Sequence, residues 1–174
     1  AMDIEGLGEK QIRAFFDEGL IKAPADIFTL EARDGADDGA LAEREGWGET
    51  SVANLFQAIT ERRRIPLGRF IYALGIRHVG QSNAGLLARS YLPFEIFETA
   101  LVVAQEREGE AWEELLNIDG IGPAVAGALL DFFAEPHNLE ALRALLGQVT
   151  VEAVAPAATD GSAVAGKTLV FTGT

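Results

Sequence analysis

The chain has 174 residues, of which 48% are hydrophobic, and it carries a formal net charge of −13. This length suits one domain, or one domain with a fragment of another. It contains no cysteine, which excludes disulfides and cysteine-based zinc or iron–sulfur sites. No apolar run reaches the ~20 residues that cross a bilayer, so we expect a cytoplasmic protein without membrane contact. The negative charge of the whole chain argues against nucleic acid as a partner.

A short glycine pattern recurs along the chain and predicts a repeated unit. Gly-x-Gly occurs from Gly6 to Gly8, from Gly46 to Gly48 and from Gly120 to Gly122. In a further copy, from Arg77 to Gly80, His78 takes the place of the first glycine. Apolar residues follow each copy at the i, i+3, i+4 spacing of one buried helix face: Ile12, Phe15, Phe16; Val52, Leu55, Phe56, Ile59; Ala84, Leu87, Ala88, Tyr91; Ala126, Leu129, Leu130, Phe133.

We therefore predict an all-α fold of four units, each built as helix, tight hairpin, helix. Most of the leading helix of the first unit is missing, which suggests a fragment of a longer chain. Residues 31–46 are rich in Asp, Ala and Gly and predict a loop with a short helix. In the fourth unit, residues 110–118 predict the leading helix, and Pro123 lies in the first turn of the next helix, where proline is tolerated.

The helical periodicity ends after Leu146, and the composition changes. We assign residues 1–148 to the helical domain. Residues 149–165 are small and contain Pro, Gly and Thr, which is typical of a linker. Residues 166–174, GKTLVFTGT, contain a β-branched apolar run that predicts the first strand of a truncated domain.

A glycine turn that leads into a helix can bind an anion. Free N–H groups point outward there beside the positive end of the helix dipole, and a glycine without Cβ lets a phosphate come close. Four such turns on one rigid body could follow a nucleic-acid backbone without reading bases. The alternative is that Gly-x-Gly only closes tight helix–helix turns in a structural bundle.

The local positive charge supports phosphate binding, although the chain as a whole is acidic. Between Thr60 and Arg89 the chain carries six arginines and one glutamate. Three arginines in a row can also be a solvated helix face, but here polar donors follow the Arg77 hairpin. The predicted DNA contacts are Gly6, Gly8, Gly46, Gly48, Arg62, Arg63, Arg64, Arg69, Arg77, His78, Gly80, Gln81, Ser82, Asn83, Gly120 and Gly122.

The four hairpins are not expected to bind equally. Glu9 and Glu49 directly follow the first two glycine pairs, and Asp119 precedes the fourth. Acids at a helix N-terminus stabilise the helix but repel an incoming phosphate. We therefore expect the third hairpin to bind most strongly.

Five segments, in this order, resemble bacterial NAD-dependent DNA ligases: MDIEGLGEKQI, WGETSVANL, IPLGRFIYALGIRHVGQSNAGLLA, LLNIDGIGPAVAGALLDFF and GKTLVFTGT. The first four are similar to the helix-hairpin-helix domain of that family, and the last looks like the opening strand of the BRCT domain. The resemblance implies a parent enzyme that seals nicks in duplex DNA during replication and repair, through an enzyme-adenylate made from NAD. It also implies a monomer whose hairpins hold the duplex by its phosphates, alongside the other domains of the ligase.

The chain also departs from the pattern of the family. The catalytic lysine of the family lies in a Lys-x-Asp-Gly motif, and Lys10, Lys22 and Lys167 have other contexts. Thr50 stands where the second hairpin of the family tends to have a lysine. We therefore expect no ligase activity and no bound cofactor in this fragment. NAD, magnesium and structural zinc are implied for other parts of the parent enzyme.

Three alternatives stay open from the sequence. Base-excision glycosylases also use a helix-hairpin-helix, but their bifunctional members carry a lysine just after the hairpin, where this chain has Pro123 and Ala124. A non-enzymatic tandem-hairpin module of another repair protein would bind DNA in the same way. An acidic protein-interaction domain would suit the net charge, and steep salt dependence of DNA binding would exclude it.

Overall fold

The helical class predicted from the sequence is confirmed by a computed structural model, which describes residues 2–36 and 39–153. The helices are α1 (Glu9–Asp17), α2 (Leu30–Arg33), α3 (Glu49–Glu61), α4 (Leu67–Ala73), α5 (Gln81–Ser90), α6 (Phe94–Val103), α7 (Glu110–Leu116), α8 (Pro123–Ala134) and α9 (Pro136–Leu146). Short 3-10 helices are η1 (Pro24–Thr29), η2 (Leu41–Glu43) and η3 (Ala104–Glu106), and the strands are β1 (Arg64–Pro66) and β2 (Thr150–Glu152). The predicted strand over residues 166–174 lies outside the described residues.

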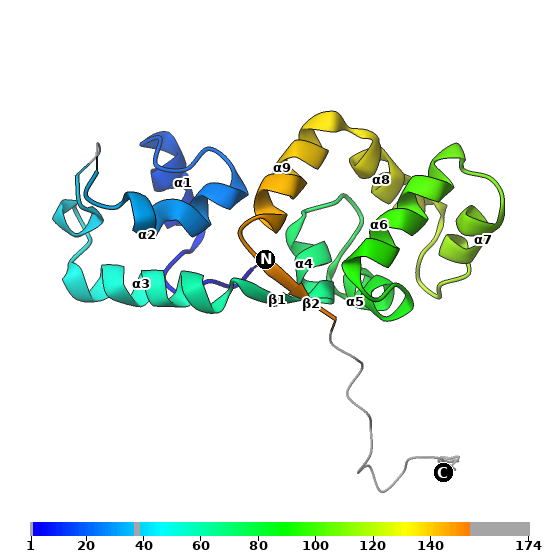
Figure 1. Cartoon of the computed structure of the whole chain (residues 1–174), viewed down its shortest axis with the longest axis horizontal. Coiled ribbons are helices and arrows are strands. Elements are labelled where there is room, and N and C mark those ends of the chain that lie inside the picture. Colours follow the sequence, from blue (N-terminus) through cyan, green and yellow to red (C-terminus); the bar gives the residue numbers. More distant parts are fainter. Residues whose placement is uncertain (1, 37–38, 154–174) are drawn as a thin grey trace, which may run out of the picture.

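The helices form an elongated molecule with two ends (Figure 1). Helices α1, α2 and α3 lie at one end, and α4 to α8 lie at the other. Helix α9 returns toward the middle of the molecule and packs on η1, the segment that follows α1. A single hydrophobic cluster runs from Ile4 to Val149 and joins both ends into one body.

The predicted second helix of each unit begins directly after the last hairpin glycine, as α1, α3, α5 and α8. The apolar stripe is buried in three of them, with Leu55, Leu87 and Leu129 almost fully inaccessible to solvent. The first unit differs, because Ile12 is 40% exposed and Phe16 is 60% exposed. Helix α1 therefore buries only Phe15 of its predicted stripe.

The leading helices match the prediction in only part of the chain. The fourth unit has its leading helix as α7, and the third unit has α4. In the second unit the element directly before the hairpin is the single 3-10 turn η2, which follows η1 and the short α2. No helix precedes the first hairpin within residues 2–8.

Helices α4 and α5 pack closely at Gly68, where a Cβ would already be in van der Waals contact with α5. A Cβ atom added to Gly68 would lie 3.4 Å from the Cα atom of Gly85 and 3.5 Å from the Cβ atom of Ala88. Small residues on both helices let the two backbones approach, and this crossing fixes the hairpin that joins α4 to α5.

A parallel two-stranded sheet joins the middle of the chain to its end, which the sequence analysis did not predict. Strand β1 pairs with β2, with Ile65 opposite Val151. Ile65 is fully buried and Val151 is partly buried. Residues 150–152 were assigned to a linker, because three alternating residues give too short a pattern to identify a strand. Their partner strand lies more than eighty residues earlier in the chain.

The close α4–α5 crossing gives a first test. We expect Gly68→Ile to lower the free energy of unfolding by about 1–3 kcal/mol, because a branched side chain would overpack the crossing. The measurement is a urea titration followed by circular dichroism. Ala53→Ile is the matched control, since Ala53 is exposed on α3, and it should change stability by less than about 1 kcal/mol. Equal losses in the two variants would show that the crossing tolerates a larger residue.

Candidate nucleic-acid interface

The four hairpins share one backbone turn. The amide of the middle residue donates to the carbonyl three residues earlier, from Leu7 to Ile4 at 3.1 Å, and the same bond closes the other turns at 2.9–3.1 Å. The residue before the middle one is left-handed in every copy, with φ of 79° at Gly6, 82° at Gly46, 65° at His78 and 86° at Gly120. Positive φ at this residue, and not at the residue before it, is typical of a type II turn. The four copies therefore share the turn hydrogen bond and the left-handed residue.

This turn directs the middle residue of each hairpin into the protein. Leu7, Val79 and Ile121 are buried. Trp47 is partly buried and stacks on Phe15, with ring centroids 5.5 Å apart. The middle residue therefore anchors each hairpin to the core, and the glycine or histidine before it and the glycine after it stay at the surface.

His78 adopts the left-handed conformation at a position where the other hairpins have glycine. A residue with Cβ is disfavoured there, and a side-chain hydrogen bond supports it, because Asn83 Nδ2 donates to the His78 carbonyl at 3.1 Å. The imidazole itself is exposed, so it stays available to a ligand.

The last hairpin glycine begins each following helix with the same geometry. Gly8, Gly48, Gly80 and Gly122 are extended and their carbonyls accept the first helical bond, at 2.9–3.0 Å. Among the described residues, the amides of Gly8, Gly80 and Gly122 have no hydrogen-bond partner. These unbonded N–H groups belong to the glycines that the sequence predicts to contact an anion.

The second hairpin is different because of Ser51, which was not among the predicted site residues. The Gly48 amide donates to Ser51 Oγ at 2.9 Å, and this hydroxyl also lies 2.9 Å from the Gly48 carbonyl. Ser51 bonds the N-cap amide as the N3 side chain of a capping box does, but the sequence lacks that pattern, because the N-cap is Gly48 and the N3 residue is neither Glu nor Gln.

The hairpins are arranged as two pairs. The first hairpin lies against α3, where a Cβ on Gly6 would meet Leu55 Cδ1 at 3.9 Å. The second lies against α1 through the Trp47–Phe15 stack. The fourth lies against α5, where a Cβ on Gly120 would meet Leu86 Cδ1 at 3.1 Å. We call the first two hairpins the first pair and the last two the second pair.

Several of the predicted arginines have partners within the protein. Arg62 and Arg69 both reach the Asp3 carboxylate, at 3.5 and 3.4 Å, and Arg62 Nε donates to the Asp3 carbonyl at 2.8 Å. Arg64 forms an ion pair with Glu152 across the two-stranded sheet.

The Arg63 side chain links segments that are distant in the chain. Its guanidinium donates to the carbonyls of Phe28 and Gln148, the second at 3.0 Å, and lies 5.6 Å from the centre of the Phe28 ring. It thereby joins η1, the start of β1 and the segment before β2. The sequence could not show this, because its partners are 35 and 85 residues away.

The third hairpin keeps its polar groups at the surface. Arg77, His78, Gln81 and Ser82 are exposed, and Asn83 is partly buried. No hydrogen bond or ion pair holds the Arg77 side chain within the described residues. This hairpin therefore presents one cation, several neutral donors and the free Gly80 amide together.

Known proteins give the context for this arrangement. A family model described as a helix-hairpin-helix motif matches residues 69–142. The DNA ligase of Parvibaculum lavamentivorans is 56% identical over 99% of this chain, and that of Nitrobacter winogradskyi is 55% identical over 99%. The chain is therefore similar to a segment of bacterial DNA ligases, and residues 69–142 match the helix-hairpin-helix motif. The predicted resemblance is confirmed, and the chain spans about a quarter of the length of these relatives, 24% and 25%.

The structure shows neither a metal cluster nor a membrane-spanning helix in the part of the chain that it describes. In residues 2–36 and 39–153, no cluster of His, Asp or Glu could hold a metal ion. Within the same residues, no helix is long and apolar enough to cross a membrane.

The structural role of Arg63 can be separated from ligand binding. We expect Arg63→Gln to lower the free energy of unfolding by about 1–3 kcal/mol, because two partly buried carbonyls lose their donors. Arg77→Gln should change it by less than about 0.5 kcal/mol, since Arg77 is exposed. Thermal and urea unfolding measure both. A stable Arg63→Gln variant would show that its hydrogen bonds contribute little to the fold.

Proposed function

We propose that this chain binds duplex DNA through its phosphates, without reading base sequence. One observation carries the proposal: the hairpins share one turn and one helix start, which place backbone amides at the protein surface. Amides at a helix N-terminus bind anions, and repeated hairpins suit the regularly spaced phosphates of DNA. Contacts to phosphates carry no sequence information.

The charges near the third hairpin support the same function. Arg77 is exposed without an internal partner among the described residues, and Arg89 is an exposed cation later on the same α5 unit. A local cation lowers the free energy of phosphate binding even on an acidic protein, because salt screens charges beyond ~10 Å. The net charge of −13 therefore does not exclude DNA.

We further propose that the chain acts within an NAD-dependent DNA ligase that seals nicks in bacterial replication and repair. The support is the identity to proteins named DNA ligase over 99% of this chain and the ligase-like motifs in its sequence. In this proposal, other parts of a longer cytoplasmic, monomeric protein supply the adenylated lysine and bind NAD, magnesium and structural zinc. In this proposal the present chain binds the nicked duplex DNA and has no ligase activity alone.

The test is fluorescence anisotropy of a labelled nicked duplex at about 50 and about 200 mM salt. If about four phosphates are contacted, the affinity should fall about a hundredfold between the two conditions. The variant carries Arg77→Glu and Gly80→Asp, which place carboxylates where a phosphate would lie. We expect its binding to be lost at both salt concentrations.

The control for this variant has the same change of net charge elsewhere. Lys22→Glu with Ala144→Asp alters two exposed positions away from the hairpins and should retain most of the binding. Circular dichroism shows whether each variant is folded. Two results would contradict phosphate binding at the third hairpin. One is a wild-type affinity that does not change with salt concentration, and the other is an equal loss of affinity in the variant and its control.

A further inference from the structure

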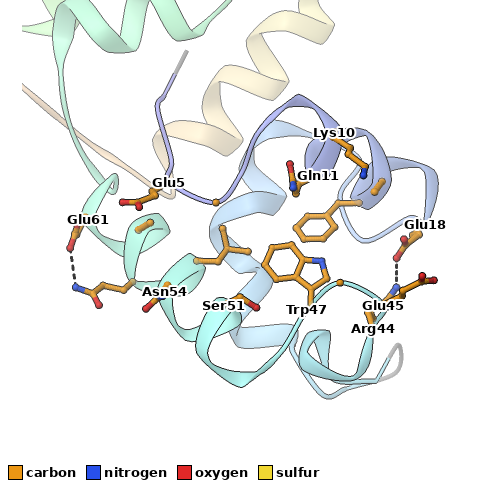
Figure 2. A pocket seen from close by; sticks show the side chains of 17 residues that line it. Glu5, Lys10, Gln11, Glu18, Arg44, Glu45, Trp47, Ser51, Asn54 and Glu61 are labelled. Carbon is orange, nitrogen blue, oxygen red and sulfur yellow. Dashed lines mark hydrogen bonds and ion pairs between the residues drawn. The ribbon is translucent and has the colours of Figure 1, made fainter.

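The first hairpin has less apolar support than the other three. Ile4 and Leu7 anchor it to the core, but no helix leads into it within residues 2–8, and α1 buries only Phe15. A groove of about 850 Å³ lies between this hairpin and Trp47 of the second (Figure 2). Another groove, of about 880 Å³, lies between it and α4, α8 and α9. Apolar packing alone therefore determines the position of this hairpin only weakly.

Polar contacts hold Asp3, which lies just before this hairpin. Its backbone is left-handed, with φ of 60°, a conformation that aspartate adopts more readily than most residues. Arg62 Nε donates to the Asp3 carbonyl at 2.8 Å. The Asp3 carboxylate lies 3.5 Å from Arg62 Nη2 and 3.4 Å from Arg69 Nη1. The next residue, Ile4, accepts the hydrogen bond that closes the turn, so Asp3 is held where the turn begins.

The two arginines connect Asp3 to the neighbouring units. Arg62 is the C-cap of α3, and Arg69 lies in α4, whose close packing on α5 fixes the third hairpin. Asp3 and Gln81, the first residue of α5, line the same hollow of about 640 Å³. The segment before the first hairpin therefore lies beside the helix start of the third hairpin.

These contacts form a network around one carboxylate. A single exposed ion pair contributes little, because solvent screens it and both side chains lose freedom. Here two guanidinium groups share the Asp3 carboxylate, and Arg62 also donates a charge-assisted hydrogen bond to the backbone. Asp3 is the common point of the network, and its charge offsets the repulsion between the two cations.

We propose that Asp3 is a positioning residue for DNA binding, which through Arg62 and Arg69 fixes the first hairpin relative to the third. The amides of Gly8 and Gly80, which have no partner among the described residues, are then held at one separation and contact phosphates of one duplex together. Weak contacts add to one affinity only where the geometry allows them simultaneously. This inference rests on the proposed function.

The positioning role and the effect of charge alone predict opposite results for one substitution. Asp3→Gly removes the carboxylate and keeps the left-handed backbone, which glycine adopts readily. The Asp3 side chain is 74% exposed, so its removal leaves no cavity in the core. Loss of a negative charge by itself would raise the affinity for DNA. We expect instead that affinity for the nicked duplex, measured by fluorescence anisotropy, falls about fivefold, because the first hairpin no longer engages together with the third.

Asp17→Gly is the matched control for this substitution. Asp17 is exposed at the end of α1 and has no ion pair among the described residues. Its replacement makes the same change of net charge and should alter the affinity by less than about twofold.

A double-mutant cycle tests whether the effect passes through the first hairpin. Gly8→Asp and Gly122→Asp place a carboxylate at the N-caps of α1 and α8, where it repels a phosphate. In the Gly8→Asp background, Asp3→Gly should lower the affinity by less than about twofold, since the first hairpin no longer binds. In the Gly122→Asp background, the fall of about fivefold should remain, because the fourth hairpin does not depend on Asp3.

The position of the first hairpin can be measured without DNA. The chain has no cysteine, so spin labels can be attached through Arg13→Cys on α1 and Ser90→Cys on α5, both exposed. Pulsed electron paramagnetic resonance should give a narrow distance distribution when Asp3 is present and a broader or shifted one in Asp3→Gly. The Asp17→Gly control should leave the distribution unchanged.

The outcomes separate this inference from the proposed function. Salt-dependent binding by the wild type, together with a loss in Asp3→Gly that disappears in the Gly8→Asp background, supports both. An affinity in Asp3→Gly that equals or exceeds that of the wild type, a full loss in the Gly8→Asp background, or an unchanged distance distribution overturns the positioning role alone. A wild type without salt-dependent binding overturns both.

Circular dichroism shows whether each variant is folded. If Asp3→Gly is unfolded, Asp3→Asn takes its place, because asparagine also adopts the left-handed conformation and lacks the charge. A lower affinity in Asp3→Asn then supports the positioning role, and an equal or higher affinity overturns it.

Discussion

The left-handed residue in each hairpin turn is the constraint on which the rest of the structure depends. It reverses the chain within four residues, so that the middle residue enters the core while the next helix starts at the surface. Without it, Val79 and Ile121 could not be buried next to outward amides. Glycine adopts this conformation at little cost, and His78 is supported there by the hydrogen bond from Asn83.

The hairpins share one backbone turn but carry different charges at their surfaces. The residue before the left-handed one and the first residue of the following helix are exposed in all four hairpins, so their charge can vary while the fold is kept. The first pair has glutamates at these positions, whereas the third hairpin has Arg77 and Gln81. The net charge of −13 is therefore a poor guide to the partner, because a ligand senses only the charges within about a Debye length.

The arginine-rich stretch, residues 60–89, shows what the sequence can predict and what it cannot. Its positive charge follows from the composition, but the sequence does not distinguish one neighbouring arginine from the next. In the structure Arg63 ties three segments together, Arg64 pairs with Glu152, and Arg77 has no internal partner among the described residues. These differences arise from partners that are distant in sequence, and nothing in the spacing of the arginines encodes them.

The sequence by itself determined the repeated unit: the positions of the hairpins, the helix that follows each, and the buried stripe on α3, α5 and α8. These features are local, since glycine spacing and a 3.6-residue period act within about fifteen residues. The tertiary structure decided which hairpins pair, why Ile12 and Phe16 of the first unit stay exposed, and that β1 meets β2. These depend on contacts between segments far apart in the chain, which form only when the whole core is assembled.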